Sequence, residues 1–242
     1  MLGSATARTT AFHPAIHSSI PTAKPLEFVP ASGKSIDAAG QRLSGTMRLM
    51  GATMSFTRNS EIFGEGEPAE YLYKVISGCI RTYRILGDGR RQITGFYLPG
   101  DVFGLAFGAD HTESAEAITD SKVLVLKRRA LDAIADRDAA ITHELFALTG
   151  RELRRVQDRI LLLVESAQER VVGFLLEMAE RLAADRTFEL PMSRQDIADY
   201  LGLTIETVSR TLTALEDRAT IEVGGSRRIV LRNRAALTAM VS

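Results

Sequence analysis

The stretch from Ser193 to Asp217, SRQDIADYLGLTIETVSRTLTALED, constrains the fold more than any other part of the chain. Ser193 followed three residues later by Asp196 is a helix-start signal of the capping-box type, with Asp in place of Glu or Gln. Gly202 then permits the positive φ of a tight turn, and Thr204 is placed to cap a second helix. This order predicts a helix-turn-helix, although any corner between two helices can share part of it.

The outward face of the second predicted helix indicates what such a unit binds. Glu206, Ser209 and Arg210 lie at i, i+3 and i+4 in its first turns, where a recognition helix meets the edges of bases. An Arg fork can bind O6 and N7 of guanine, and Glu can accept a hydrogen bond from N4 of cytosine. We therefore predict base contacts for these three residues. An ion pair within the helix is the alternative for Glu206 and Arg210, and both can hold.

A strand, a glycine turn and a second strand follow in IEVGGSRRIVLRNR, which predicts a wing beside the two helices. Arg227 and Arg228, next to the turn, are expected to contact phosphates. Residues 207–234 hold six Arg against three acidic residues, a local excess in a chain whose 30 Lys+Arg balance 30 Asp+Glu. Further contacts to the DNA backbone are expected near the starts of the two helices, from Ser193, Arg194, Thr204 and Thr207.

Short apolar runs separated by glycine turns extend from about Met47 to Leu126. Turns spaced by about 8–12 residues predict an all-β barrel or sandwich. The segment Leu86–Arg90, LGDGR, predicts a hairpin with a tight turn. Cys79 is the only cysteine, and it is expected to be a buried structural thiol within a strand over 71–86. A redox role is the alternative.

Helical periodicity replaces the strand pattern from about residue 128 to residue 182. A narrow apolar stripe with charged flanks predicts a long, coiled-coil-like dimerisation helix, and a core helix of the protomer is the alternative. A second helix is expected over 167–184. The stripe that forms the predicted dimer seam comprises Ile141, Leu145, Leu148, Val156, Ile160 and Leu163.

Composition limits what else the chain can be. Residues 1–40 are rich in Ala, Ser, Thr and Pro and are expected to be a disordered arm, with an irregular ordered extension as the alternative. Neither a signal peptide nor an apolar run long enough for a membrane span is visible, so a cytoplasmic protein without membrane contact is expected. One cysteine excludes an intramolecular disulfide and a cysteine-held iron–sulfur cluster. The spacings of a phosphate loop, a catalytic triad or a metal site are absent, so no enzyme, metal or cofactor is predicted.

These motifs, with GEGEPAEYLYKVISGCIRTY and LPGDVFGL, resemble the Crp/Fnr superfamily of bacterial transcription regulators over about residues 45–240. The resemblance implies an α+β fold: a cyclic-nucleotide-binding-like β-roll, a long dimerisation helix and a C-terminal winged helix-turn-helix. It implies a homodimer that binds palindromic double-stranded DNA and acts with RNA polymerase, as an activator by family default. The expected divisions are an arm at 1–40, the roll at 41–135, the dimerisation helix at 136–165 and the DNA-binding domain at 166–242.

Differences from that superfamily refine the expectation. The pattern of Glu206, Ser209 and Arg210 is similar to the Fnr and FixK type, which implies half-sites of the TTGA kind. Where the cAMP receptor holds its ligand with Gly-Glu and Arg-Ser-Ala, this chain has Gly104-Leu105 and Glu113-Ser114-Ala115. The effector pocket is therefore expected to be degenerate at Leu105, Glu113 and Ser114, with no cyclic nucleotide bound.

The missing cysteine cluster points to the FixK-like subgroup, because Fnr holds its iron–sulfur cluster with several cysteines. That analogy implies a regulator of oxygen-limited respiration and nitrogen-fixation genes that needs no small-molecule effector. The alternative is a ligand-gated, Crp-like sensor whose β-roll binds an unidentified small molecule.

Overall fold

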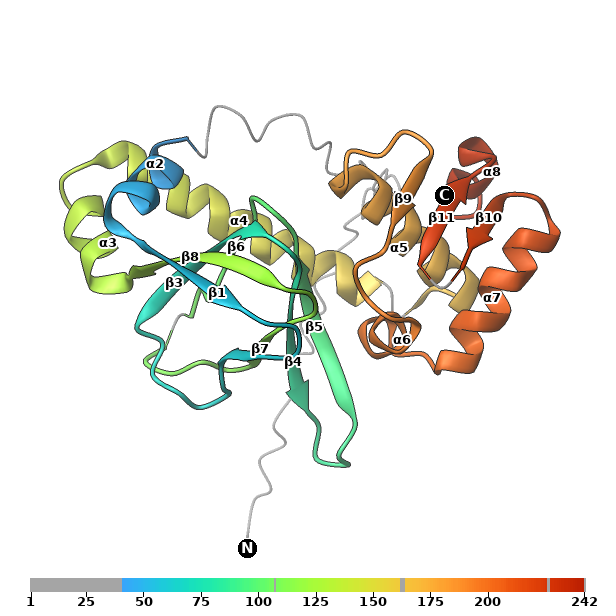
Figure 1. Cartoon of the computed structure of the whole chain (residues 1–242), viewed down its shortest axis with the longest axis horizontal. Coiled ribbons are helices and arrows are strands. Elements are labelled where there is room, and N and C mark those ends of the chain that lie inside the picture. The colour runs from blue at the N-terminus through green and yellow to red at the C-terminus, as the bar shows by residue number, and fades with distance from the viewer. Residues whose placement is uncertain (1–40, 107, 162–163, 226, 242) are drawn as a thin grey trace, which may run out of the picture. The chain divides into compact units, whose positions relative to one another are not determined.

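Two four-stranded antiparallel sheets form the β-roll of the N-terminal half (Figure 1). One sheet has the order β1-β8-β3-β6 and the other has the order β2-β7-β4-β5. The computed structural model describes residues 41–241 except 107, 162–163 and 226. The strands are β1 Ala52–Phe56, β2 Glu61–Phe63, β3 Tyr71–Ser77, β4 Ile80–Ile85, β5 Arg91–Tyr97, β6 Val102–Phe103, β7 Ser114–Ala117 and β8 Ser121–Lys127.

Turns in the roll fall where glycine is required. Gly78 has φ +89°, and a Cβ at this position would lie 2.2 Å from Oγ of Ser121. The chain therefore turns between β3 and β4, and Cys79 lies in that link; the prediction of one strand over 71–86 is wrong at this point. The predicted hairpin is confirmed, because the Leu86 N–H donates to the Arg90 carbonyl at 2.8 Å between β4 and β5.

Three helices pack with the roll: α2 (Gln41–Met50), α3 (Arg128–Ala135) and α4 (Ala139–Leu161). The sequence did not predict α2, whose first turn contains no acidic residue. Its first N–H groups instead donate to the carboxylate of Glu144, a buried residue of α4. The distances are 3.2 Å from the amide of Arg42 and 2.7 Å from that of Leu43. A carboxylate about 100 positions away in the sequence thus caps the N-terminus of α2.

The apolar stripe of α4 divides between two surroundings. Ile141 and Leu148 are buried, and Leu145 packs with them, in a core cluster that includes residues of α2, β8 and α3. Two residues of the predicted dimer seam, Ile141 and Leu148, are thus covered by their own protomer, and Leu145 is half-buried; the seam itself stays a prediction. Val156 and Ile160 are exposed, and Leu163 lies outside the described residues. Helical spacing alone predicts a buried face, but it does not say which partner buries that face.

The C-terminal part contains the predicted helix-turn-helix and wing. Gly202 has φ +65° between the two helices, and both halves of the predicted capping box form between Ser193 and Asp196. The sequence did not predict a third strand, β9, which gives the small sheet the order β10-β11-β9. The elements are α5 Ala167–Arg181, β9 Thr187–Glu189, α6 Arg194–Leu201, α7 Ile205–Asp217, β10 Ile221–Gly224, β11 Arg228–Leu231 and α8 Arg234–Thr238.

One apolar cluster joins the roll to the C-terminal elements. It includes Cys79 and Phe96 from the roll and Phe174 from α5, and Tyr200 of α6 packs against it. The Phe96 ring lies 6.2 Å from that of Phe174 and 5.1 Å from that of Tyr200, centroid to centroid. Burial raises the pKa of the Cys79 thiol to about 12, which agrees with the predicted buried thiol.

The predicted arm, residues 1–40, lies outside the described residues. The predicted domain boundaries stay predictions. Within the described ranges, no helix combines the length and the apolar character that a membrane span needs.

Candidate nucleic-acid interface

The first helix of the motif, α6, starts at a doubly bonded cap. The Ser193 hydroxyl accepts from the amide of Asp196 at 3.1 Å, and Oδ2 of Asp196 accepts from the amide and the hydroxyl of Ser193 at 3.0 and 2.7 Å. Ile197, Ala198 and Leu201 are buried, so this helix is anchored along its inner face. The hydroxyl of Ser193, predicted to contact phosphate, is thus already used in the cap.

The second helix, α7, presents its first turns to solvent. The Thr204 hydroxyl accepts from the amide of Thr207 at 3.2 Å, which fixes the helix start. Val208, Leu212 and Leu215 are buried beneath it. Because a helix repeats every 3.6 residues, Glu206 and Arg210 fall on the opposite side, and both are exposed.

Local groups keep the Glu206 side chain charged. Its own backbone amide and the Thr204 hydroxyl lower the pKa of the Glu206 carboxyl, and the charge of Arg210 contributes less. The alternative in which Arg210 is the main partner of Glu206 is therefore weak. A carboxylate and a guanidinium stand side by side on an exposed helix face, as reading a cytosine and a guanine requires.

Two of the predicted contact residues meet at the crossing of the helices. A guanidinium nitrogen of Arg194 on α6 donates to the hydroxyl of Ser209 on α7 at 3.4 Å. Both residues are half-buried. The hydrogen bond brings the cationic group of Arg194 close to the first turns of α7, which suits a phosphate that flanks the bases.

Of the two wing arginines predicted to contact phosphates, one is exposed and the other is half-buried. Gly225 turns the chain with φ +67°, and Arg228 is exposed with its aliphatic stem lying over Gly224. Arg227 is half-buried and donates to the carbonyl of Pro191 at 3.2 Å. Arg228 is therefore the stronger candidate for a phosphate contact.

Neighbouring acidic groups neutralise much of the positive charge counted in the sequence. Arg232 pairs with Glu222 across the wing, and Arg234 pairs with Glu180 at 3.1 Å. The positive charge available to DNA is thus smaller than the count over residues 207–234 predicted, because Arg232 and Arg234 each have an acidic partner.

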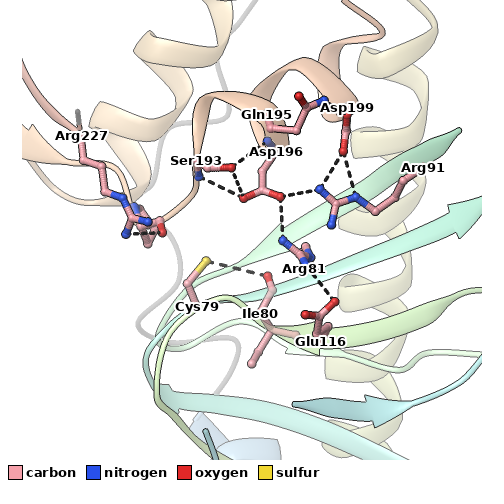
Figure 2. A network of polar contacts seen from close by, with 11 residues as sticks. Cys79, Ile80, Arg81, Arg91, Glu116, Ser193, Gln195, Asp196, Asp199 and Arg227 are labelled. Atoms are coloured by element: carbon pink, nitrogen blue, oxygen red, sulfur yellow. Dashed lines mark hydrogen bonds and ion pairs between the residues drawn. The ribbon is translucent and has the colours of Figure 1, made fainter. Parts of the chain in front are cut away.

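A polar network between α6 and the roll was not predicted from the sequence (Figure 2). Asp196 accepts from Arg81 of β4 at 2.6 Å and from Arg91 of β5 at 2.9 Å. Arg91 also reaches Asp199 at 2.7 Å, and Arg81 reaches Glu116 of β7 at 2.8 Å. The sequence offered one signal, since Arg81 interrupts an apolar run, but nothing identified its distant partners.

The residues predicted to form a degenerate effector pocket have ordinary structural partners. Leu105 packs against the apolar cluster of α3 and α4. Glu113 accepts a hydrogen bond from the Thr94 hydroxyl, and Ser114 accepts from the amide of Glu65 at 2.9 Å.

Tyr97 occupies the interior of the roll near Glu113. Its ring is so close to Gly95 that a Cβ there would meet the Tyr97 hydroxyl at 3.2 Å. Burial raises the pKa of the Tyr97 hydroxyl first, and the carboxylates of Glu152 and Glu113 raise it further. Burial also raises the pKa of Glu152 itself. The Arg155 guanidinium, 6.0 Å from the centre of the Tyr97 ring, and the Thr82 side chain act in the opposite direction and lower the pKa.

Two surface clefts lie elsewhere. One of about 390 Å³ is lined by residues of α2 and β3, including Arg48 and Lys74, and one of about 300 Å³ is lined by Asp185, Arg186 and neighbours. Neither contains a residue of the predicted effector pocket. In the described part of the chain, no cluster of three His, Cys, Asp or Glu side chains suits a metal ion.

Two family models match the chain. Residues 53–138 match the cyclic nucleotide-binding domain, and residues 169–240 match the Crp-like helix-turn-helix domain. These ranges cover the roll and the C-terminal helices and wing described above.

Relatives and solved structures give the same assignment. The chain is 48% identical over 202 residues to the "Nitrogen fixation regulation protein FixK" of Azorhizobium caulinodans, a match covering 81% of this chain and 82% of the relative. It is 35% identical to the "Fumarate and nitrate reduction regulatory protein" of Salmonella typhimurium, covering 76% of each. The solved structure of FixK2 from Bradyrhizobium japonicum superposes with a TM-score of 0.77 at 49% identity, covering 80% of this chain and 98% of that one.

Proposed function

Because the chain belongs to the Crp/Fnr family, as a FixK-like DNA-binding transcription regulator and not an enzyme, we propose that it acts as a homodimer on palindromic DNA. Each protomer reads a half-site of the TTGA kind without a small-molecule effector. The regulated genes are those of nitrogen fixation and oxygen-limited respiration, and the protein activates them together with RNA polymerase.

The exposed pair on α7 is the observation on which this proposal depends. Glu206 and Arg210 lie one turn apart on a helix whose other side buries Val208, Leu212 and Leu215, so both side chains are exposed to a partner. Arg210 binds O6 and N7 of the guanine, and Glu206 accepts from N4 of the paired cytosine. Ser209, which is half-buried against Arg194, supports these two contacts from the side.

Contacts to phosphates position this helix in the major groove. Arg228 of the wing and Arg194 at the start of α6 supply cationic groups, and Arg227 precedes Arg228 in the chain. Thr204 and Thr207 lie at the helix N-terminus, where hydroxyl and amide groups favour an anion. Such contacts supply affinity and register, whereas the base contacts supply specificity.

The second half of α4 supplies the proposed dimer face. Leu153, Val156 and Ile160 are each more than half exposed, and they are spaced by three and four residues. Phe146 lies seven residues before Leu153 and is 78% exposed. A row at heptad spacing with no cover in its own protomer fits the seam of a coiled coil with a second copy.

Effector independence is supported by the interior of the roll. The buried Tyr97 ring lies in the interior of the roll, with Glu113, Glu152 and the Arg155 guanidinium near it. Glu113 stands where the resemblance places the phosphate-binding arginine of the cAMP receptor, so a carboxylate replaces that donor. The relatives' names, which concern nitrogen fixation and fumarate and nitrate reduction, support the proposed set of genes.

The test measures binding of the purified protein, in air and with nothing added, to a duplex containing TTGA, six base pairs and TCAA. A second duplex has both guanines and their partner cytosines replaced. We expect tight binding only to the first, with two protomers per duplex in analytical ultracentrifugation. Weak binding to both duplexes would overturn the effector-free regulator and favour the ligand-gated alternative.

A variant of the dimer face tests the assembly separately. Ile160→Glu should convert the dimer into a folded monomer, because the introduced charge would be buried against the partner. Its matched control is Arg151→Glu, a charge change at another exposed position of the same helix. A dimer that survives Ile160→Glu unchanged would show that the face lies elsewhere.

A further inference from the structure

The two carboxylate oxygens of Asp196 have separate partners. Oδ2 accepts from Ser193 within the capping box, at 3.0 Å from its amide and 2.7 Å from its hydroxyl. Oδ1 accepts from Arg81 at 2.6 Å and from Arg91 at 2.9 Å, both on the roll (Figure 2). One side chain therefore links the start of α6 to two neighbouring strands of the roll.

This contact is buried. The side chains of Arg81 and Asp196 are 11% and 5% exposed, and Glu116 holds a second nitrogen of Arg81 at 2.8 Å. Nε of Arg81 is a buried polar atom without a hydrogen bond in the described part of the chain. The attraction within a buried ion pair is largely offset by the loss of hydration, so such a pair adds little net stability. What it imposes is geometry, because displacement leaves a buried charge unpaired.

A second attachment holds the other end of α6. Arg91 pairs with Asp199 at 2.7 Å, and the amide of Gln92 donates to the carbonyls of Asp199 and Tyr200 at 2.6 and 3.3 Å. The helix is thus fixed to β5 near its last turn as well as at its start. Two attachments along one helix restrict its rotation, which a single contact would not do.

The attachment leaves the reading face open. Glu206 and Arg210 on α7 are exposed while all these contacts are made. The recognition helix α7 is coupled to α6 through the Arg194–Ser209 hydrogen bond and the apolar core that the two helices share. The direction of α7 therefore follows from the way the roll holds α6.

We propose that Arg81 and Arg91 are positioning residues for DNA recognition. They fix the angle at which each protomer presents α7, and so they fix the distance between the two half-sites that one dimer can occupy at once. This inference rests on the proposed function, because it needs a dimer on a palindrome. In this view the roll, whose effector residues are predicted to be degenerate, holds α6 and α7 in a fixed orientation.

The test compares Arg91→Gln with Arg90→Gln. Arg90 is the adjacent residue, but it is exposed and pairs with Asp88 inside the hairpin, so it is a matched control. Binding is measured to palindromes with spacers of five, six and seven base pairs and to a single half-site. We expect Arg91→Gln to lower affinity for the best palindrome about tenfold and to flatten the dependence on spacer length, with half-site affinity unchanged.

Two further variants separate positioning from folding. Gln92→Ala removes attachments to α6 without leaving a buried charge, and it should flatten the spacer dependence in the same way. The conservative variant Arg91→Lys keeps a cation beside both Asp196 and Asp199, and it should retain much of the spacer preference. Urea denaturation of each variant separates a loss of folding from a change in spacer preference.

Three results would overturn the inference. The first is that Arg91→Gln and Gln92→Ala keep the wild-type spacer preference. The second is that the half-site and the palindrome lose affinity equally, which indicates a direct phosphate contact. The third is that Arg91→Lys loses the spacer preference as fully as Arg91→Gln. If the wild-type protein itself binds a palindrome no better than a half-site, the proposed function fails first, and that result is distinguishable from the others.

Discussion

The inner side of α6 and the outer side of α7 carry the same kinds of charge but use them differently. On α6, Asp196 and Asp199 are met by arginines of the roll at 2.6–2.9 Å. On α7, Glu206 and Arg210 stay exposed, and the groups that lower the pKa of the Glu206 carboxyl belong to α7 and its cap. The paired charges on α6 hold that helix against the roll, whereas the exposed charges on α7 are available to another molecule.

The largest effect should come from breaking the inner network. Arg81→Ala removes a guanidinium that two buried carboxylates share, so Asp196 and Glu116 lose part of their compensation. We expect the free energy of unfolding to fall by about 3 kcal/mol, measured by urea denaturation. Arg84→Ala is the control on the same strand, because its pair with Glu65 is exposed, and it should cost less than about 1 kcal/mol. Equal losses in both variants would contradict the division between the two faces.

Changing the outer face should alter binding and leave folding intact. Arg210→Ala should cost about 1–3 kcal/mol of binding free energy and relax discrimination at the guanine. Its unfolding midpoint should match that of the wild type, since the side chain is exposed. Competition titrations with the intact and the guanine-substituted duplex measure this. Undiminished affinity for the intact duplex would show that α7 is not the reading helix.

Phosphate contacts at the wing should have a smaller and sequence-independent effect. Arg228→Ala should weaken binding to both duplexes by a similar factor, and it should reduce the slope of log affinity against log salt by about one. Arg232→Ala serves as the control, because that arginine already pairs with Glu222. The measurement is a titration at several salt concentrations. A loss confined to the intact duplex would assign Arg228 to base reading instead.

The smallest effect concerns pH. The Glu206 amide and the Thr204 hydroxyl lower the pKa of the Glu206 carboxyl, so this group stays ionised until the pH falls below its ordinary value. Any contribution of the Glu206 charge to folding stability is fully present above the pKa of this group in the unfolded chain. That contribution is lost as the pH falls through its lower pKa in the folded chain. The ratio of wild-type to Glu206→Gln affinity should therefore stay constant between pH 5 and 7. A ratio that declines by pH 5 would show that the carboxyl is not held in its charged form.

Short-range signals made the C-terminal unit predictable. The capping box at Ser193, the turn at Gly202 and the cap at Thr204 each act within four residues, and all three form as expected. The same holds for the hairpin turn at Leu86–Arg90. Local hydrogen bonds and positive φ angles need only neighbouring residues, so a sequence displays them directly.

Long-range partners were not predictable in this way. Arg81 and Asp196 are 115 positions apart, and the cap that Glu144 gives to α2 spans about 100 positions. The apolar stripe of α4 shows the same limit, because Ile141 and Leu148 have the spacing of a coiled coil but pack in a core cluster of their own protomer. Spacing defines a face, and only the tertiary fold decides what covers it.

The lone cysteine gives this chain a practical advantage for measuring motion. Cys79 is buried, its thiol has a pKa of about 12, and no second cysteine exists in the sequence. The native thiol is therefore unreactive toward maleimide dyes at neutral pH. A cysteine introduced at exposed Arg90 and another at exposed Arg232 can be labelled while Cys79 stays unlabelled. Energy transfer between such dyes would follow the roll and the wing in a single molecule as it meets DNA.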